Sequence, residues 1–210
     1  MIARFGRNFV TKNLVPGQRV YGERLMRKKG VEYRVWDPTR SKVAAALMNG
    51  MKIPFSEDML VLYLGVASGT TASHLSDIIT RGMIFGVDFA PRVLREFILL
   101  SETRKNLVPV FADANRPEMY RHLVPEVDMI VQDVAQPNQD QILLKNAQMF
   151  LKKGGLAFVA IKARSIDVTK KPKEIFREFK ETVKDRFRII SEKRLEPFEK
   201  DHLALLLEFK

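Results

Sequence analysis

The sequence predicts an α/β protein built on a mostly parallel β-sheet, with a small antiparallel β region before it. Continuous apolar runs are typical of strands buried on both faces of a parallel sheet. Five such runs recur along the chain, at residues 59–64, 83–87, 107–111, 129–131 and 156–161. Helix-like stretches separate them, as in a doubly wound fold. These stretches lie at residues 72–80, 91–104, 117–123 and 139–151.

The amino-terminal part of the chain has a different pattern. Short β-like segments at residues 9–11, 18–21 and 31–36 are separated by glycine-containing turns, which predicts a small antiparallel sheet. A helix should follow, with Asp37 as its cap, a body over residues 43–48 and an end at Gly50. We therefore expect a β-rich subdomain over residues 1–55 that ends in a helix, and a main domain over residues 56–210.

The carboxy-terminal part predicts a reversed strand. A helix near residues 173–184 precedes two β-like segments, at residues 187–192 and 203–209. The residues between these segments are too few for a crossover helix, so the two strands must pair antiparallel. A mostly parallel sheet whose last strand is antiparallel is a familiar feature of Rossmann-like methyltransferases.

Charge and composition narrow the function. The chain has 36 Lys and Arg against 25 Asp and Glu, a formal net charge of +11. Such a surplus favours a nucleic-acid partner, because a polyanion gains affinity by releasing counterions; solubility or thermophilic habit would also explain it. The absence of cysteine excludes disulfides and favours a cytosolic protein. No apolar run is long enough for a membrane span, and the three His lack metal-ligand spacing, so no metal site is expected.

A glycine-rich turn follows the first apolar run. Ligands of open α/β sheets bind beyond the carboxyl ends of the strands. Glycines there let the backbone approach a ligand, and the following helix offers free N–H groups. The G-x-x-x-G spacing differs from the G-x-G-x-x-G of dinucleotide-binding proteins, and a plain strand-to-helix turn remains an alternative. The candidate cofactor contacts in this turn are Gly65, Ala67, Ser68, Thr70 and Thr71.

Acidic residues follow the next three strands. Asp88, with Phe89 beside it, suits the hydroxyls of an adenosine ribose. Asp113 with Ala114 suits an adenine amine. A single such Asp is often only a helix cap, but three at successive strand ends indicate an adenosine-bearing cofactor. The remaining candidates are Asp133, Val134, Ala135 and Gln136 after the fourth run, and Lys162 after the fifth.

The motifs resemble those of the fibrillarin family, the methyltransferases of box C/D ribonucleoprotein particles, in its archaeal form. The resemblance covers nearly the whole chain. The chain lacks the Arg-Gly-rich amino-terminal tail of eukaryotic members, which favours the archaeal form and a cytosolic location. The motifs that carry the resemblance are Tyr33–Pro38 with Ser41–Ala45, Tyr63–Thr71, Gly86–Ala90, Asp133–Pro137, Ile161–Arg164 and Asp201-His202.

The resemblance implies methyl transfer from S-adenosyl-L-methionine to the ribose 2′-hydroxyl of RNA. The implied targets are rRNA and, in archaea, some tRNA, chosen by base pairing with a box C/D guide RNA. The implied protein partners are a Nop-domain scaffold and a kink-turn-binding ribosomal-type protein. The family's catalytic tetrad corresponds here to Lys42, Asp133, Lys162 and His202.

We hypothesise that Lys162 orients the hydroxyl and accepts its proton if burial or neighbouring Lys42 favours its neutral form. Asp133 would position Lys162, and Lys42 and His202 would complete the network. Without the resemblance, Lys42 is better interpreted as an exposed helix lysine and His202 as a strand-edge histidine. Arg164 and the basic segment 170–173 lie just beyond Lys162 and are candidates for contact with the RNA backbone.

Three alternatives remain open. The chain could be a non-catalytic RNA-binding or assembly module on a decayed methyltransferase fold, which the intact glycine turn, Asp88 and Lys162 disfavour. It could be a nicotinamide-dependent oxidoreductase, which the glycine spacing and the reversed last strand disfavour. A methyltransferase of small molecules is disfavoured by the net charge.

Overall fold

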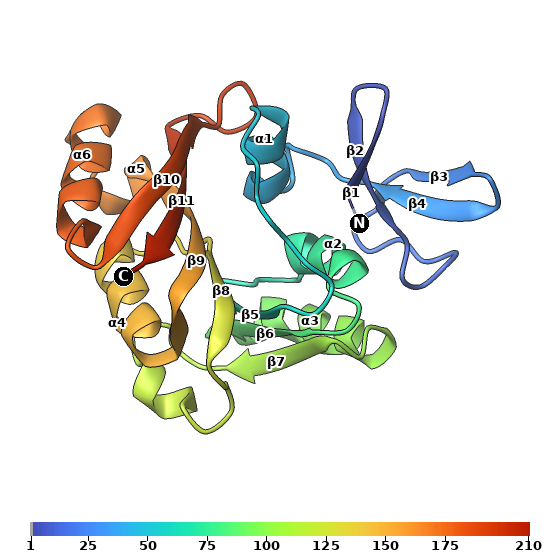
Figure 1. Cartoon of the computed structure of the whole chain (residues 1–210), viewed down its shortest axis with the longest axis horizontal. Coiled ribbons are helices and arrows are strands. Elements are labelled where there is room, and N and C mark those ends of the chain that lie inside the picture. The colour runs from blue at the N-terminus through green and yellow to red at the C-terminus, as the bar shows by residue number, and fades with distance from the viewer. Residues whose placement is uncertain (1) are drawn as a thin grey trace.

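The structure is a computed structural model that describes residues 2–210, and it contains two sheets (Figure 1). The smaller sheet is antiparallel, with the order β1-β2-β4-β3. Its strands are β1 (Ile2–Phe5), β2 (Asn8–Lys12), β3 (Leu25–Lys28) and β4 (Val31–Val35). The predicted small sheet is therefore present, although β1 was not foreseen.

Residues 18–21 do not form the predicted strand. The Glu23 carboxylate accepts the backbone N–H groups of Val20, at 3.0 Å, and of Tyr21, at 2.9 Å. This stretch of backbone thus donates to a nearby side chain and not to a neighbouring strand. The strand that pairs with β4 is β3, further along the chain.

Helix α1 (Lys42–Met48) links the two sheets, and its cap differs from the prediction. Ser41 is the N-cap, and its Oγ accepts the N–H of Ala44. Asp37 instead accepts the N–H of Thr39, at 2.8 Å, and so closes the turn before the helix. The helix ends before Gly50 as predicted, where φ is +83°. Its apolar residues pack into the core of the larger sheet.

The larger sheet has the order β10-β11-β9-β8-β5-β6-β7. Strands β7, β6, β5, β8 and β9 are parallel, and β11 is antiparallel to both of its neighbours. The reversed last strand is thus confirmed, but it lies inside the sheet, with β10 at the edge. The strands are β5 (Leu60–Leu64), β6 (Met83–Asp88), β7 (Leu107–Phe111), β8 (Val127–Gln132), β9 (Leu151–Lys162), β10 (Phe187–Arg194) and β11 (His202–Phe209).

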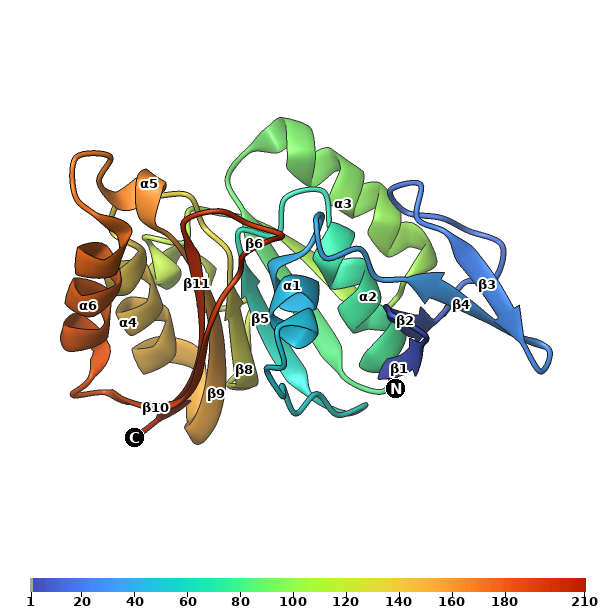
Figure 2. The same ribbon diagram turned by 90° about the horizontal axis from the view of Figure 1, so that it is seen from above.

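Helices cover both faces of this sheet, giving three layers (Figure 2). One face packs against α4 (Gln139–Phe150) and α6 (Pro172–Val183), and the other against α1, α2 (Thr70–Ile78) and α3 (Pro91–Thr103). A short helix, α5 (Ala163–Ile166), follows β9 directly. No helix within residues 2–210 is both long and apolar enough to cross a membrane.

The helix predicted over residues 117–123 is only a four-residue 3₁₀ turn, η1 (Pro117–Tyr120). Pro125 disfavours a helical conformation at the residue before it, so a longer helix cannot continue into β8. The turn is held by Tyr120, which is fully buried and stacks on Phe150 with 5.4 Å between ring centroids. The apolar spacing of this stretch therefore reflects one anchor residue.

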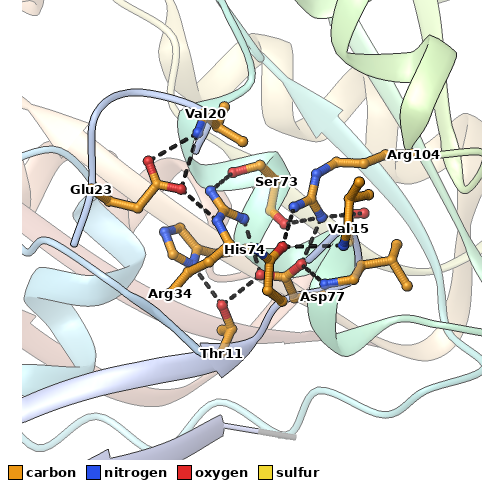
Figure 3. A network of polar contacts seen from close by, with 12 residues as sticks. Thr11, Val15, Val20, Glu23, Arg34, Ser73, His74, Asp77 and Arg104 are labelled. Atoms are coloured by element: carbon orange, nitrogen blue, oxygen red, sulfur yellow. Dashed lines mark hydrogen bonds and ion pairs between the residues drawn. The ribbon is translucent and has the colours of Figure 1, made fainter. Parts of the chain in front are cut away.

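A buried polar network joins the small sheet to α2 (Figure 3). Asp77 of α2 accepts from Arg34 of β4, at 3.0 Å, and from Arg104, at 2.6 Å. Both guanidiniums have fully buried side chains, and Arg34 also pairs with Glu23 at 2.5 Å. Burying charge is tolerable only when each charge is paired and hydrogen-bonded. The network thus demands one relative placement of the small sheet, α2 and the end of α3.

His74 extends this network as a neutral side chain. Burial lowers its pKa well below the usual value, and the nearby guanidiniums lower it further. Thr11 gives its hydroxyl proton to Asp77 and therefore accepts from His74 Nδ1, at 2.7 Å. His74 Nε2 is then an acceptor for the Tyr21 hydroxyl, at 2.8 Å. Trp36 is buried and stacks on the His74 ring.

Asp77→Ala should lower the free energy of unfolding by about 3–5 kcal/mol, because it leaves two buried guanidiniums without their shared carboxylate. Urea denaturation followed by circular dichroism measures this loss. The matched control is Glu57→Ala, which removes a carboxylate paired with Arg81 at the surface and should cost about 1 kcal/mol or less. Equal losses in the two variants would show that the network does not hold the two sheets together.

Candidate active site

The carboxyl ends of the parallel strands carry the predicted site residues, and a tight loop leads from β5 to α2. Gly65 in this loop has φ of +77°, and a Cβ there would lie 2.5 Å from the carbonyl oxygen of Asp133. Gly69, with φ of +87°, is the N-cap of α2. Only glycine adopts this conformation at so close an approach. The loop therefore lies directly against the end of β8.

Asp88, at the end of β6, holds this loop in place. One carboxylate oxygen accepts the N–H of Ala67 at 2.9 Å, and the other accepts the N–H of Ala90 at 2.9 Å. Ala67 has φ of +50°, so the bond from Asp88 supports an unusual backbone conformation. Each carboxylate oxygen has a second acceptor position, which leaves Asp88 able to bind a pair of hydroxyl groups.

A cavity of about 310 Å³ opens between this loop and the ends of β6, β7 and β8. Nine of the predicted cofactor residues line it: Gly65, Ala67, Asp88, Phe89, Ala114, Asp133, Val134, Ala135 and Gln136. Phe89 is 57% exposed and stands at its rim. Four further lining residues are small and apolar and were not predicted from the sequence: Val87, Ala90, Val93 and Ala112. Val87 and Ala112 directly precede Asp88 and Asp113, and this position in the sequence could have marked them as cavity residues.

Four predicted cofactor residues do not line this cavity. Ser68 and Thr70 line a different pocket, beside the loop that contains Tyr21. Thr71 is buried and donates its hydroxyl to the Ser41 hydroxyl, at 2.9 Å. Asp113 accepts the N–H of Asn115 and so closes the turn before η1. Helix geometry after β5 thus directs the Thr71 hydroxyl toward α1, whereas the second carboxylate oxygen of Asp113 accepts no hydrogen bond from residues 2–210.

Asp133 pairs with Lys42, contrary to the hypothesis that it positions Lys162. Lys42 Nζ lies 3.2 Å from Asp133 Oδ2, and both side chains are about one-quarter exposed. Lys162 is exposed, and no acidic oxygen within the described chain lies within 4.0 Å of its Nζ. The difference arises because α1 brings Lys42 over the end of β8, a placement that periodicity alone does not reveal.

Lys42 is a charged donor in this arrangement. Burial lowers the pKa of its ammonium, but the charges of Asp133 and Glu199 outweigh that effect, and the net shift is upward. A raised pKa keeps the proton on the amine at neutral pH. Lys42 can therefore donate hydrogen bonds at the mouth of the cavity, whereas acceptance of a proton must fall to another group.

His202 supplies an unpaired acceptor. It begins β11 and pairs in register with Lys162 of β9, and it is only 5% exposed. Its Nδ1 lies 2.7 Å from the carbonyl oxygen of Lys200, which can only accept, so Nδ1 carries the proton. In the neutral imidazole Nε2 is then a free acceptor, buried and without a partner among residues 2–210. Such an orphaned atom at a ligand-binding edge is a mark of a functional group.

Lys42, Asp133, Glu199 and His202 form a polar cluster at this edge of the sheet. Glu199 was not among the residues predicted from the sequence. Its carboxylate lies 3.8 Å from Lys42 Nζ and 3.9 Å from His202 Nδ1. The hairpin loop that carries it is tied to α1, because the Asn49 side chain donates to the carbonyl oxygens of Arg194 and Glu196. An acid in a hairpin loop ordinarily indicates a solvated residue, so no local signal marked this one.

The sheet order, the loop after β5 and the acid after β6 give the chain the fold and the cofactor-type cavity of a Rossmann-like methyltransferase. The model of the fibrillarin family matches residues 2–210. The chain belongs to the fibrillarin family.

Relatives support this assignment in sequence and in structure. The chain is 58% identical, over 94% of its length and 88% of the other, to a fibrillarin-like rRNA/tRNA 2′-O-methyltransferase of Pyrococcus abyssi. An Aeropyrum pernix fibrillarin with natively bound S-adenosyl-L-methionine superposes with a TM-score of 0.90 at 47% identity, covering 99% and 97% of the two chains. A fibrillarin in complex with Nop5p superposes with a TM-score of 0.94 at 37% identity, covering 100% and 97%.

Gly65→Ala should destabilise the protein by about 1–3 kcal/mol more than a matched glycine change, because its Cβ would meet a backbone carbonyl that cannot move aside. The control is Gly154→Ala, at a similar φ of +75° but with nothing within 4 Å of the added carbon. Chemical denaturation of both variants gives the comparison. A Gly65→Ala protein as stable as the control would mean that the loop is not pressed against β8.

Proposed function

We propose that this chain transfers a methyl group from S-adenosyl-L-methionine to the ribose 2′-hydroxyl of rRNA and tRNA, at positions chosen by a box C/D guide RNA. The observation that carries the proposal is the double position of Asp133. Asp133 lines the cofactor-type cavity, and its carboxylate also pairs with Lys42 in the polar cluster. A bound methyl donor would therefore lie beside the groups that can orient a hydroxyl.

The cavity has the chemistry that an adenosine-bearing cofactor needs. The acceptor positions left on Asp88 suit the two ribose hydroxyls. Val87, Ala112 and Ala114 offer apolar contacts for a flat base, and exposed Phe89 stands where it can cover it. The cofactor supplies an electrophilic methyl group on a sulfonium. Asp113, next to Ala114 of the cavity lining, stays a proposed contact for the adenine amine, whereas Ser68 and Thr70 line another pocket and the Thr71 hydroxyl is bound to Ser41.

The proposed catalytic set is Lys42, Asp133, Lys162 and His202. In-line displacement depends on holding the attacking oxygen in one place. Lys162, exposed at the strand end and not engaged by an acid, orients the 2′-hydroxyl. Asp133 keeps Lys42 charged and in position as a second donor. His202 is the cross-strand partner of Lys162. Its Nε2 offers the acceptor toward which the hydroxyl proton points.

The partners follow from the relatives. A fibrillarin of closely similar structure is found in complex with Nop5p, which supports a Nop-domain scaffold for this chain as well. The guide RNA and the kink-turn-binding protein follow from the family resemblance. The scaffold would hold this chain near a paired guide and target, because the cluster itself contains nothing that distinguishes one nucleotide from another.

The proposal is tested by transfer of a labelled methyl group to RNA, with and without scaffold and guide, followed by mapping of the label. Label should appear on ribose opposite the guide. Label on a base or on protein would refute the proposal. A chain that fails to bind S-adenosyl-L-methionine in calorimetry would be the non-catalytic RNA-binding module instead.

Lys162→Ala should lower the rate of methyl transfer by about 10²-fold, the loss expected when the attacking hydroxyl is no longer held in place. Its affinity for S-adenosyl-L-methionine should be unchanged, because Lys162 does not line the cavity. The control is Lys153→Ala, an exposed lysine near the other end of the same strand, which should retain full activity. Wild-type rates in Lys162→Ala would remove the role proposed for it.

Glu199→Gln should slow methyl transfer about three- to fivefold, as expected for a partly exposed charge pair worth up to ~1 kcal/mol. It should also lower the pKa of Lys42, because one of the two charges that raise it is lost. Activity that needs the Lys42 ammonium would then decline at a lower alkaline pH than in the wild type. A pH–rate profile checks the shift, with exposed Glu126→Gln as control; coincident profiles would assign Glu199 no part in the cluster.

A further inference from the structure

A groove runs along the surface between the first turns of α6 and the last residues of β10. We call it the α6–β10 groove; its volume is about 1060 Å³. These two elements lie side by side at one end of the molecule, beyond β9 and β11 (Figure 1). The start of β11 forms its inner end. None of the residues proposed above for cofactor binding or catalysis lines it.

Two unpaired lysines give this groove a positive character. Five cationic residues line it, and two of them are held by acids: Lys180 pairs with Glu192, and Arg194 with Glu196. Lys193 pairs in register with Ala204, whose face of the sheet is opposite α6, so its ammonium does not add to the groove. Lys171 and Lys173 have no acidic oxygen within 4.0 Å anywhere in the described chain. Three acids line the groove. Glu192 is paired with Lys180 and Asp201 with Arg164, so Glu174 is the one lining acid without a salt bridge among residues 2–210. The groove therefore has a surplus of free positive charge.

The floor of the groove does not favour the reading of bases. The Phe176 ring is 4% exposed, and the Arg194 guanidinium lies over it, 4.9 Å from the ring centroid. A covered ring cannot serve as a stacking platform. The accessible groups are ammonium groups on long flexible stems, which contact phosphate without specifying sequence.

The groove is continuous with the edge of the sheet that carries Lys162 and His202, which we call the catalytic edge. Asp201, at its inner end, directly precedes His202, and its carbonyl oxygen accepts the N–H of Ala163 at 3.2 Å. Ala163 is the residue after Lys162. A strand whose ribose lies at Lys162 and His202 must leave this edge over adjacent surface, and the positive groove begins there.

We propose that the α6–β10 groove binds the phosphate backbone of the RNA strand that carries the target ribose, on one side of the target nucleotide. This inference rests on the proposed function, since it takes the catalytic edge as the place where the ribose lies. RNA is favoured over an acidic protein segment because the groove starts at the edge to which the RNA must be delivered.

The test measures binding of the full chain to a fluorescein-labelled, single-stranded 12-nucleotide RNA by anisotropy, over a series of salt concentrations. A double variant, Lys171→Gln with Lys173→Gln, should bind at least tenfold more weakly at low salt. The slope of log K against log[salt] should fall by roughly 1.4, because each lost phosphate contact on a single strand contributes about 0.7.

The control is a second double variant with the same change of charge, Lys29→Gln with Lys105→Gln. Both lysines are exposed and lie away from the groove, on the small-sheet hairpin and just before β7. It should bind RNA within about threefold of the wild type. Both variants should bind S-adenosyl-L-methionine with wild-type affinity in calorimetry, which shows that they are folded.

Three results would overturn the inference: no RNA binding by the wild type at low salt, a wild-type salt slope in the groove variant, or equal losses in the two variants. A groove variant that loses binding to a polyglutamate peptide but keeps binding to RNA would assign the groove to an acidic protein. The labelled-methyl assay separates this result from the proposed function. If RNA binding depends on the groove but no methyl group is transferred, the groove inference stands and the proposed reaction is rejected. If methyl transfer occurs but RNA binding does not depend on the groove, the proposed reaction stands and the groove inference is rejected.

Discussion

The shared carboxylate of Asp77 is the constraint on which the rest of the structure depends. Two buried guanidiniums converge on it, one from the small sheet and one from the end of α3. Arg104 has no other carboxylate partner among residues 2–210, and Arg34 would keep only Glu23, so loss of Asp77 would leave buried charge uncompensated and the three elements have one relative position. Asp77 lies in α2, and α2 begins at the glycine loop of the cofactor-type cavity. The network that joins the sheets therefore also holds the helix that closes this loop.

The site forms where separate parts of the chain reach one edge of the sheet. The loop after β5 and Asp88 shape the cavity. Helix α1 brings Lys42 to Asp133, and the loop after β10 brings Glu199 to both Lys42 and His202. Each charge in the cluster is partly exposed, so the cost of burial is low and solvent is displaced only when a substrate arrives. This favours a site that orients a polar group over one that binds it tightly.

Affinity for the substrate would then come from elsewhere on the molecule. The α6–β10 groove offers sequence-independent positive charge beside the cluster, and a scaffold and guide would supply the choice of nucleotide. Affinity and nucleotide choice can be separated in this way because phosphate contacts position a strand without recognising its base sequence. A chain of this kind could act on many RNA positions with the same few catalytic groups.

The sequence by itself determined the strands of the larger sheet and most of the residues that line the cofactor-type cavity. Buried parallel strands leave continuous apolar runs, and the residues after them, such as Asp88 and Asp133, must reach the same edge of the sheet. Local backbone chemistry was harder to foresee: Glu23 captured the N–H groups of a predicted strand, and Ser41 replaced Asp37 as the helix cap. Only the tertiary structure decided that Asp133 pairs with Lys42, that Glu199 joins them and that the Thr71 hydroxyl binds Ser41. These outcomes depend on how α1, α2 and the β10–β11 loop pack against the sheet, and contacts between segments distant in sequence set that packing.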